Sequence, residues 1–274
     1  MANTNKLVLA TSRLTDSANI TASSEVTSMP ASNLQRFQPT DWWQTTSLGS
    51  GGQYLEVEIT EVNGLGQASW SLISLLYTNA TVTTEWRVRA STASLAGAVS
   101  APTYDTGWVS HWPVASLTDW EWTHSLLWLS DPRPEPYIRI DVRDAALDFY
   151  RAGRLYIANA WQPSHHVKYG WSTGHVENQR RQFAEGGPVF PRIQPRRRVL
   201  SGRLNFLDQD EMFNNAWELD RARGVSEDVL AILDPEHATH VHRWMIYGLM
   251  KDLPPIVNEA YEVFEKPFEI EEAI

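Results

Sequence analysis

Strict alternation of apolar and polar residues in the first half of the chain is the feature that most narrows its fold. The segments YLEVEI (54–59), TEWRVRAS (84–91) and YIRIDVRD (137–144) place an apolar side chain at every second position. A period of two is typical of a half-buried antiparallel strand, whose apolar face needs a second sheet to cover it. Turn-rich stretches separate the segments, and no longer helical pattern precedes residue 150. The sequence therefore predicts a mainly β protein that begins with a jelly-roll β-sandwich over residues 1–165.

The second half of the chain follows a different pattern. Residues 166–198 combine glycine, proline and arginine, which disfavour a central strand, so we expect a linker or extended arm there. Residues 199–274 predict a small, split-barrel-like β-sheet that carries one α-helix. Asp208 is the expected N-cap of this helix, Glu211 follows three residues later, and Gly224 comes after its last turn. The expected apolar stripe of the helix is Met212, Phe213, Ala216, Trp217 and Leu219.

Composition excludes several classes of protein. The 274 residues include no cysteine, which excludes disulfides, thiolate metal sites and cysteine nucleophiles. A formal net charge of -10 disfavours nucleic acid as the main partner. No segment approaches the about 20 apolar residues of a membrane span, and the N-terminus lacks a signal-peptide pattern, so we expect a soluble protein made in the cytosol. The 13 tryptophans would fill a sandwich core or, if exposed, contact sugars or proteins.

Patterns for catalysis and metal binding are weak. In an expected strand over residues 239–250, His240 and His242 would share one face, with His237 nearby, and three imidazoles suffice to bind zinc. We favour the alternative of a partly exposed face shared with Trp244, because no carboxylate base or partner for the histidines is recognisable. Catalytic carboxylate pairs, G-x-S-x-G, phosphate loops and H-E-x-x-H are not recognisable either. We therefore expect no enzyme activity, no metal and no cofactor.

Two oppositely charged segments indicate contacts between subunits. The basic segment contains Arg196, Arg197 and Arg198, and the acidic C-terminal segment contains Glu269, Glu271 and Glu272. If the basic arm of one subunit faces the acidic strand of the next, the head-to-tail contact closes into a ring. Two separately solvated faces would explain the same charges equally well.

The first half of the chain resembles a known family of domains. The segments ITASSEVTSMPASNLQRFQPTDWWQTT (20–46), LLYTNATVTTEWRVRAS (75–91) and YIRIDVRDAALDFYRAGRLYIANAW (137–161) are similar to galactose-binding-like, discoidin-type jelly rolls. In that family, ligands are met by loops at one end of the sandwich. The resemblance implies that loops at one end of this sandwich bind the ligand.

The rest of the chain resembles tail proteins of long-tailed bacteriophages. The resemblance runs from GRLYIANAW (153–161) to FEIEE (268–272), and the sheet with a single helix is similar to the split barrel of siphophage distal tail proteins. It implies a non-enzymatic virion component of the tail tip, assembled in the host cytoplasm. As the family does, the chain would form a homo-oligomeric, hexameric ring that connects the tail tube protein to the hub or baseplate proteins.

Tryptophan and tyrosine side chains supply the candidate contact residues. Trp161, Tyr169 and Trp171 are expected to pack at a seam between the two domains or against a neighbouring subunit. The alternative function is a carbohydrate-binding module that attaches to a glycan of the host surface. Its candidate contacts are Trp42, Trp43, Trp108 and Trp112. Burial of half of these four in the core is the competing interpretation.

Overall fold

The structure of the chain is a computed structural model with two compact units. It describes residues 6–11, 13–60, 69–95, 101–113, 122–177, 181–183, 189–191, 195–237 and 239–274. Unit 1 consists of Met1–Gln162 and Ile232–Met245, and unit 2 of Pro163–Ala231 and Ile246–Ile274. Both are built mainly of β-strands, as the sequence predicts. The predicted boundaries differ from these units, because residues 232–245 belong with the sandwich although they lie far along the chain.

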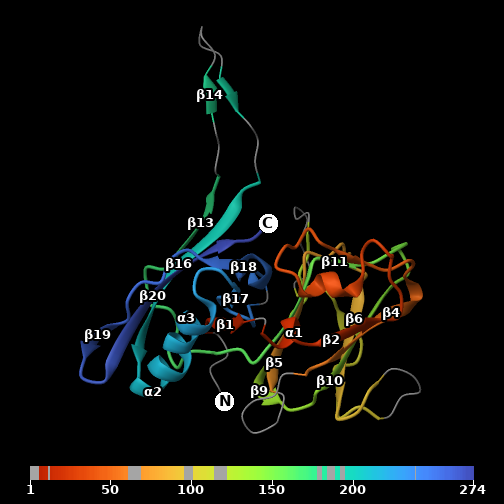
Figure 1. Cartoon of the computed structure of the whole chain (residues 1–274), viewed down its shortest axis with the longest axis horizontal. Helices are drawn as coiled ribbons and strands as arrows, with labels where there is room; N and C mark the ends of the chain where they lie inside the picture. Colours follow the sequence, from red (N-terminus) through yellow and green to blue (C-terminus); the bar gives the residue numbers. More distant parts are fainter. Residues whose placement is uncertain are drawn as a thin grey trace. The chain divides into compact units, whose positions relative to one another are not determined.

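Unit 1 contains two main antiparallel sheets (Figure 1). The larger has the order β2 (Asn19–Ala22), β4 (Gly49–Glu58), β10 (Tyr137–Asp144), β6 (Glu85–Ser91) and β7 (Tyr104–Asp105), with β8 (Val109–Ser110) also on β6. The smaller has the order β12 (Arg154–Ala158), β5 (Trp70–Leu76) and β9 (Leu127–Arg133). Outside them, β11 (Arg151–Ala152) pairs with β3 (Trp43–Gln44). The other described elements of the first 162 residues are β1 (Val8–Thr11), α1 (Arg13–Asp16) and the 3-10 helix η1 (Ala31–Gln35).

The sandwich core follows the predicted alternation. Ile140 on β10 is paired with Leu55 on β4 and with Val88 on β6, and all three side chains are buried. Ile73 of β5 and Ile157 of β12 belong to the same core cluster. The alternating residues of one sheet therefore meet the apolar residues of the other, which confirms the predicted sandwich.

The opposite face of the larger sheet is covered as well, although its residues are charged. Arg89 and Asp141 are both buried, and their side chains are joined by an ion pair of 2.7 Å. Arg139 also pairs with Asp141 at 3.0 Å and donates a hydrogen bond to the backbone oxygen of Leu95. Because a buried charge is tolerated only with a partner, this network accounts for charged residues where alternation predicted solvent.

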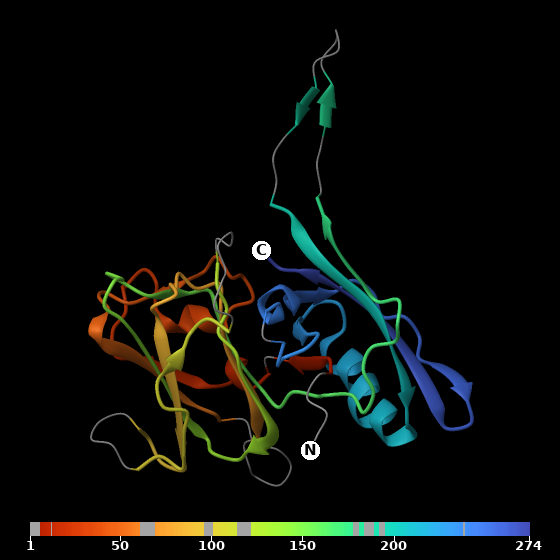
Figure 2. The same ribbon diagram turned by 180° about the vertical axis from the view of Figure 1, so that it is seen from behind.

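Unit 2 is organised around one sheet. Its strands follow the order β17 (Asp228–Ile232), β18 (Met245–Met250), β20 (Val263–Glu272), β16 (Arg197–Leu207) and β13 (Ser172–Val176), and β19 (Val257–Ala260) pairs with β20. A further pair, β14 (Arg181–Phe183) and β15 (Val189–Pro191), lies beyond the ends of β13 and β16, away from the rest of this sheet (Figures 1 and 2). The segment predicted as a linker or arm therefore contains paired strands.

One helix of unit 2 begins and ends as predicted. Its parts are α2 (Gln209–Glu211), the π-helical η2 (Met212–Trp217) and α3 (Glu218–Arg223). Asp208 Oδ1 accepts a 2.7 Å hydrogen bond from the Glu211 backbone N–H, and Gly224 ends the helix with a φ of 56°.

The predicted apolar stripe of this helix is only partly correct. Met212 and Ala216 are buried, whereas Phe213 and Trp217 are 48% and 52% exposed. The π-helical turn adds residues to each turn and rotates these two aromatic side chains away from the core. None of the described helices has the length and apolar character needed to cross a membrane.

The predicted strand over residues 239–250 is wrong in its first half. Val241–Trp244 form the short helix α4, and the strand β18 begins only at Met245. In a helical turn, His240 and His242 no longer share a face, because side chains two residues apart diverge on a helix.

Candidate functional site

The loop end of unit 1 gathers most of the candidate ligand contacts. We use this name for the end of the sandwich at which β10 finishes and β4 and β6 begin, as the pairs Asp144↔Gly49 and Arg143↔Glu85 show. The connections 77–84 and 145–150 meet there, since the side-chain amide N–H of Asn79 donates to the Phe149 carbonyl at 3.0 Å. The loop end is thus formed by segments that are distant in sequence, and its residues are fixed by strands on several sides.

A pocket of about 480 Å³ lies elsewhere, in unit 2, but the loop end has its own pocket of about 320 Å³. The loop-end pocket is lined by Ser50, Thr83, Glu85, Arg143, Asp144, Ala145 and Ala146. Arg143 Nη2 and Glu85 Oε2 form an ion pair of 2.7 Å. Both side chains are more than a third exposed, so a ligand can reach them.

Trp108 supports the arginine of this pocket. The guanidinium carbon of Arg143 lies 4.1 Å from the centroid of the Trp108 ring, which is a cation–π contact. The ion pair with Glu85 and this stack hold Arg143 from two directions. Its N–H groups and the Glu85 oxygens are therefore presented to the pocket in a defined orientation.

Asp144 fixes the floor of the pocket. Its carboxylate accepts hydrogen bonds from the hydroxyls of Thr84 (2.7 Å), Thr81 (2.8 Å) and Thr83 (3.1 Å) and from the Ala146 backbone N–H (2.7 Å). Burial acts to raise the pKa of Asp144, but these hydrogen bonds hold the pKa below its ordinary value. The ionised carboxylate thereby ties the loop before β6 to the end of β10.

A second group of flat side chains lies at the same end. The Arg151 guanidinium carbon is 4.2 Å from the Trp42 ring centroid and 4.9 Å from that of Trp122. The two tryptophan rings are 5.6 Å apart and inclined at 35°. Trp42 and Trp122 are both half-buried, so part of each ring remains available to a ligand.

The four predicted glycan contacts separate into two groups. Trp42, Trp108 and Trp112 are half-buried at the loop end, where the Trp112 Nε1–H donates to the Ala80 carbonyl at 2.9 Å. Trp43 is corrected to a core residue, because it is only 1% exposed and meets the Tyr150 ring edge to face. Trp42 and Trp43 differ in burial because the side chains of neighbouring residues in extended chain point to opposite faces.

The sequence missed three residues of the loop end. Arg143 resembled an ordinary outward residue of a strand, and Arg151 and Trp122 lie in segments without a clear pattern. Their roles depend on pairings across the fold, such as that of Arg151 with Gln44. The one feature that could have identified the two arginines is their position at strand ends in a tryptophan-rich sequence.

His111 lies fully buried beneath the loop end. Its Nε2 atom is 2.8 Å from the Tyr150 hydroxyl oxygen, and its ring centroid is 5.8 Å from that of Trp86. Burial lowers the pKa of His111 to about 3, because desolvation penalises the imidazolium ion. The imidazole is neutral at neutral pH and contributes to the core.

Acidification is expected to destabilise the protein through His111. In the unfolded chain His111 binds a proton as pH falls through about 6.5, whereas in the folded chain it does so only near pH 3. The neutral, buried His111 therefore contributes its full stability above pH 6.5, and this contribution is lost progressively as pH falls from 6.5 towards 3. Between about pH 7 and about pH 4.5 the loss is roughly 3 kcal/mol. Urea unfolding at both pH values measures it. In His111→Phe the acid-induced loss should shrink by about that amount, and equal losses in both proteins would contradict the assignment.

The three histidines considered for zinc are not brought together. The rings of His237 and His240 stack at 5.2 Å and lie near Trp244, while His242 is buried with its ring 5.0 Å from that of His124. Among the described residues, no group of three or more histidine, aspartate or glutamate side chains is placed to hold a metal ion. The helical turn of α4 explains the separation.

The predicted inter-subunit charges form pairs within one chain. Arg198 and Glu272 are both buried and joined by a 2.9 Å hydrogen bond from Arg198 Nε to Glu272 Oε1. Arg197 pairs with Glu271 at 3.1 Å. In the same unit, Glu269 pairs with Lys251 at 2.7 Å and Arg196 with Glu177 at 3.6 Å. The cause is the antiparallel pairing of β16 with β20, which sets the basic and acidic segments side by side in one sheet.

The three residues predicted to form a seam belong to different units. Trp161 lies in unit 1, where its backbone exchanges two 2.8 Å hydrogen bonds with Leu9. Tyr169 and Trp171 lie in unit 2, where Tyr169 is fully exposed and Trp171 is half-buried. Their part in assembly stays a prediction.

Comparisons with known proteins link the chain to solved sandwich domains. No protein-family model matches it, and no significant match is found among curated protein sequences. A family 32 carbohydrate-binding module from Clostridium perfringens NanJ, solved with galactose, aligns with 56% of this chain and 99% of its own, at 14% identity and a TM-score of 0.39. Chitosan-binding module 1 of a Paenibacillus sp. chitosanase/glucanase aligns with 52% of this chain and 94% of its own, at 15% identity and a TM-score of 0.35.

A third similar structure is a GH29 fucosidase from Ruminococcus gnavus in complex with fucose. It aligns with 53% of this chain and 26% of its own, at 10% identity and a TM-score of 0.39. These similarities concern the fold alone.

Proposed function

We propose that unit 1 binds carbohydrate at its loop end, with a sugar residue in the 320 Å³ pocket. The observation that carries the proposal is the Arg143–Glu85 pair, which lines the pocket while Arg143 stacks on Trp108. Sugar hydroxyls both donate and accept hydrogen bonds, so they match a site that presents fixed guanidinium donors beside fixed carboxylate acceptors.

Charge and size support a neutral sugar as the ligand. Arg143 and Glu85 neutralise each other, so the pair has little net attraction for an ion but retains its hydrogen-bonding atoms. The pocket volume is at the lower end of the roughly 300–1,000 Å³ typical of small-molecule sites. The Trp42, Trp122 and Arg151 group adds flat surfaces of the kind that pack against the C–H face of a sugar ring. The role is recognition, without catalysis or a cofactor.

Replacing Arg143 with glutamine is expected to weaken sugar binding at least about tenfold, because the charge-assisted hydrogen bonds contribute about 1.4 kcal/mol or more. A glycan array identifies the neutral sugars that the full chain binds, and isothermal titration with the best of them gives the dissociation constants. Trp108→Ala should weaken binding in the same direction, since it removes the support of Arg143.

Arg87→Gln is the matched control for this experiment. Arg87 forms an ion pair with Asp105 in the same sheet, has a comparable exposure of 29%, and is not part of the pocket lining. This variant should bind sugar as the parent does. If Arg143→Gln and Arg87→Gln bind equally well, or if the parent binds no glycan on the array, the proposal fails.

A second candidate function is a structural role in a phage tail. The observation that favours it is the β14–β15 pair at the far end of the segment that also contains β13 and β16, which extends unit 2 well beyond its sheet (Figure 2). We propose for this case a self-assembled ring at the tail tip of a siphophage virion, between the tail tube protein and the hub or baseplate proteins. The native mass of the purified full chain tests this role, and a monomer at every concentration would exclude it.

A further inference from the structure

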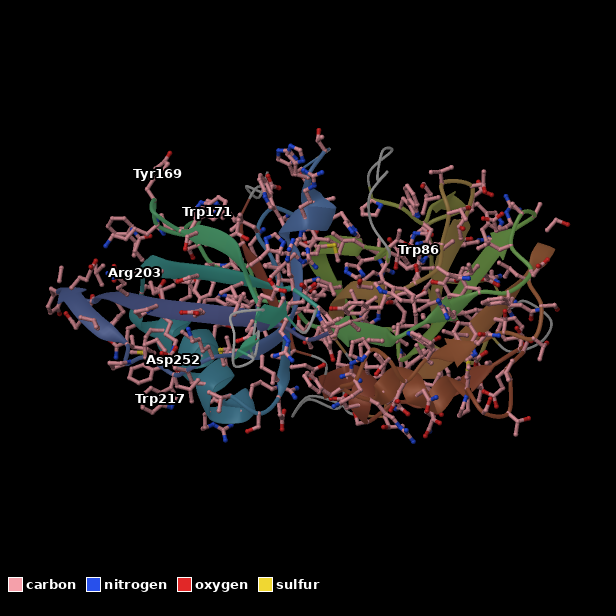
Figure 3. All side chains as sticks on the ribbon, turned by 90° about the horizontal axis from the view of Figure 1, so that it is seen from above. Trp86, Tyr169, Trp171, Arg203, Trp217 and Asp252 are labelled. Carbon is pink, nitrogen blue, oxygen red and sulfur yellow. The ribbon has the colours of Figure 1, made fainter. Side chains whose placement is uncertain are left out.

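A groove of about 480 Å³ crosses the sheet of unit 2. Its lining includes Tyr169, Trp171, Ser201, Arg203, Asp252 and Glu269. Four of them, Tyr169, Trp171, Arg203 and Asp252, are labelled in Figure 3. These residues come from the segment before β13, from β16, from β20 and from the turn after β18, so the groove runs across neighbouring strands.

Strand register sets the positions of the groove residues on β16 and β20. Ser201 on β16 is paired with Glu269 on β20, and Arg203 is paired with Pro267, so these four share one face of the sheet. Gly202 and its partner Phe268 alternate with them and also line the groove, and a β-carbon at Gly202 would lie only 2.7 Å from Val167 Cγ1 and 3.0 Å from the Phe268 ring. The absence of a side chain at Gly202 therefore lets Val167 and Phe268 pack closely against this part of β16.

One end of the groove is aromatic. The Tyr169 side chain is fully exposed, and Trp171 is half-buried. Gly170 lies between them with a φ of 96°, in the left-handed region that glycine adopts without strain. The chain can therefore turn sharply there and present both rings to the groove. A fully exposed tyrosine contributes nothing to the core, and a ligand contact would account for its placement.

The polar part of the groove is balanced in charge. Lys168 pairs with Glu265 at 2.6 Å and with Glu259 at 3.3 Å, Arg203 pairs with Glu265 at 3.1 Å, and Lys251 pairs with Glu269 at 2.7 Å. The Lys168 hydrogen bond, the largest influence, lowers the pKa of Glu265, so this carboxylate stays ionised. Each base in or beside the groove is thus already neutralised by a carboxylate, while its remaining N–H groups can still donate.

We propose that this groove binds an extended, neutral oligosaccharide. A row of donors and acceptors without surplus positive charge suits a chain of hydroxyl groups, whereas a phosphate- or sulfate-bearing ligand would meet Asp252 and Glu269 without a free cation to attract it. The two aromatic rings supply the flat surface on which a sugar ring packs. The groove volume is about half again that of the loop-end pocket, so it accommodates a longer ligand.

This site goes beyond the sugar binding proposed for unit 1, because it lies in the other unit and shares no residue with the loop-end pocket. Its test therefore uses the full chain carrying Arg143→Gln, in which we expect weakened binding at the loop-end pocket. Failure of one site leaves the measurement of the other intact, and the two proposals can fail separately.

The experiment titrates this background with neutral hexasaccharides of β-1,4-glucose, α-1,4-glucose and β-1,4-N-acetylglucosamine, and with the matching monosaccharides, by calorimetry. We expect at least one hexasaccharide to bind, and about tenfold or more tighter than its monosaccharide, since the longer ligand contacts more of the groove. Trp171→Ala and Asp252→Asn should each weaken this binding about tenfold.

Trp217→Ala is the matched control, because Trp217, labelled in Figure 3, is a half-exposed tryptophan of the same unit. It is not among the residues that line the groove. Its affinity should equal that of the background protein. Thermal unfolding checks that each variant folds, and Tyr169→Ala provides a second aromatic test at a fully exposed position. Absence of binding by every hexasaccharide, equal affinity for hexasaccharide and monosaccharide, or unchanged affinity in both Tyr169→Ala and Asp252→Asn would overturn the proposal.

Discussion

Trp43→Ala is expected to lower the free energy of unfolding by about 3–5 kcal/mol, the range for a large aromatic residue removed from a packed core. Trp43 is 1% exposed, packs against Tyr150 and donates its Nε1–H to the Ser24 carbonyl. The alanine would leave a cavity in the sandwich core and remove the indole donor of the partly buried Ser24 carbonyl. Urea unfolding followed by circular dichroism measures the change.

Trp42→Ala provides the comparison, since it removes the same type of side chain at the neighbouring position. Trp42 is half-buried and stacks on Arg151, so its removal should cost only about 1 kcal/mol. The pair of variants tests the assignment of one tryptophan to the core and the other to the loop end. Equal destabilisation by both, or a larger effect of Trp42→Ala, would contradict it.

Glu272→Gln is expected to destabilise the protein by about 3 kcal/mol or more, because it removes the counter-charge of a buried arginine. The side chains of Arg198 and Glu272 are only 8% and 7% exposed, and Glu272 also accepts a 2.9 Å hydrogen bond from the Arg198 backbone N–H. Denaturant unfolding gives the size of the effect.

Protein concentration separates the two interpretations of this ion pair. A pair within the chain gives a denaturation midpoint that is the same at about 1 µM and about 100 µM, whereas a pair between subunits makes the midpoint rise with concentration. Glu271→Gln serves as the control, because the Arg197–Glu271 pair is 47% and 27% exposed and should contribute no more than about 1 kcal/mol. A concentration-dependent loss in Glu272→Gln would restore the inter-subunit assignment.

Much of the architecture follows from local patterns in the sequence. Alternation over 54–59 and 137–144 predicts β4 and β10 because a sheet with one buried face imposes a period of two. Asp208 and Gly224 predict the ends of the helix because capping is a local interaction between a side chain or a left-handed residue and the nearest turn.

The errors arise where distant contacts decide the conformation. The π-helical turn at Met212–Trp217 and the helical turn of α4 are not favoured by any local signal, and both redirect aromatic or histidine side chains. Arg89 and Asp141 are buried together because they meet across β6 and β10, which alternation alone does not reveal.

The sequence could predict which type of residue forms a candidate site, but not the full set of residues that the fold brings together there. Surface tryptophans indicated a glycan contact, and Trp42 and Trp108 do lie at the loop end. The charged partner Arg143 and the groove in unit 2 depend on strand register, because the side chains that share a face are brought there by the pairing of separate strands. Single-sequence patterns contain no information on register between distant strands.

The division of the chain has a consequence for how this protein can be dissected or recombined. Because residues 232–245 belong to unit 1 while both flanking segments belong to unit 2, one cut in the backbone cannot release either unit whole. A fragment that ends after Gln162 would lack His242, whose ring lies against His124 in the intact unit. Transfer of the sandwich to another protein, by a gene fusion or in evolution, would therefore require two junctions and an internal insertion.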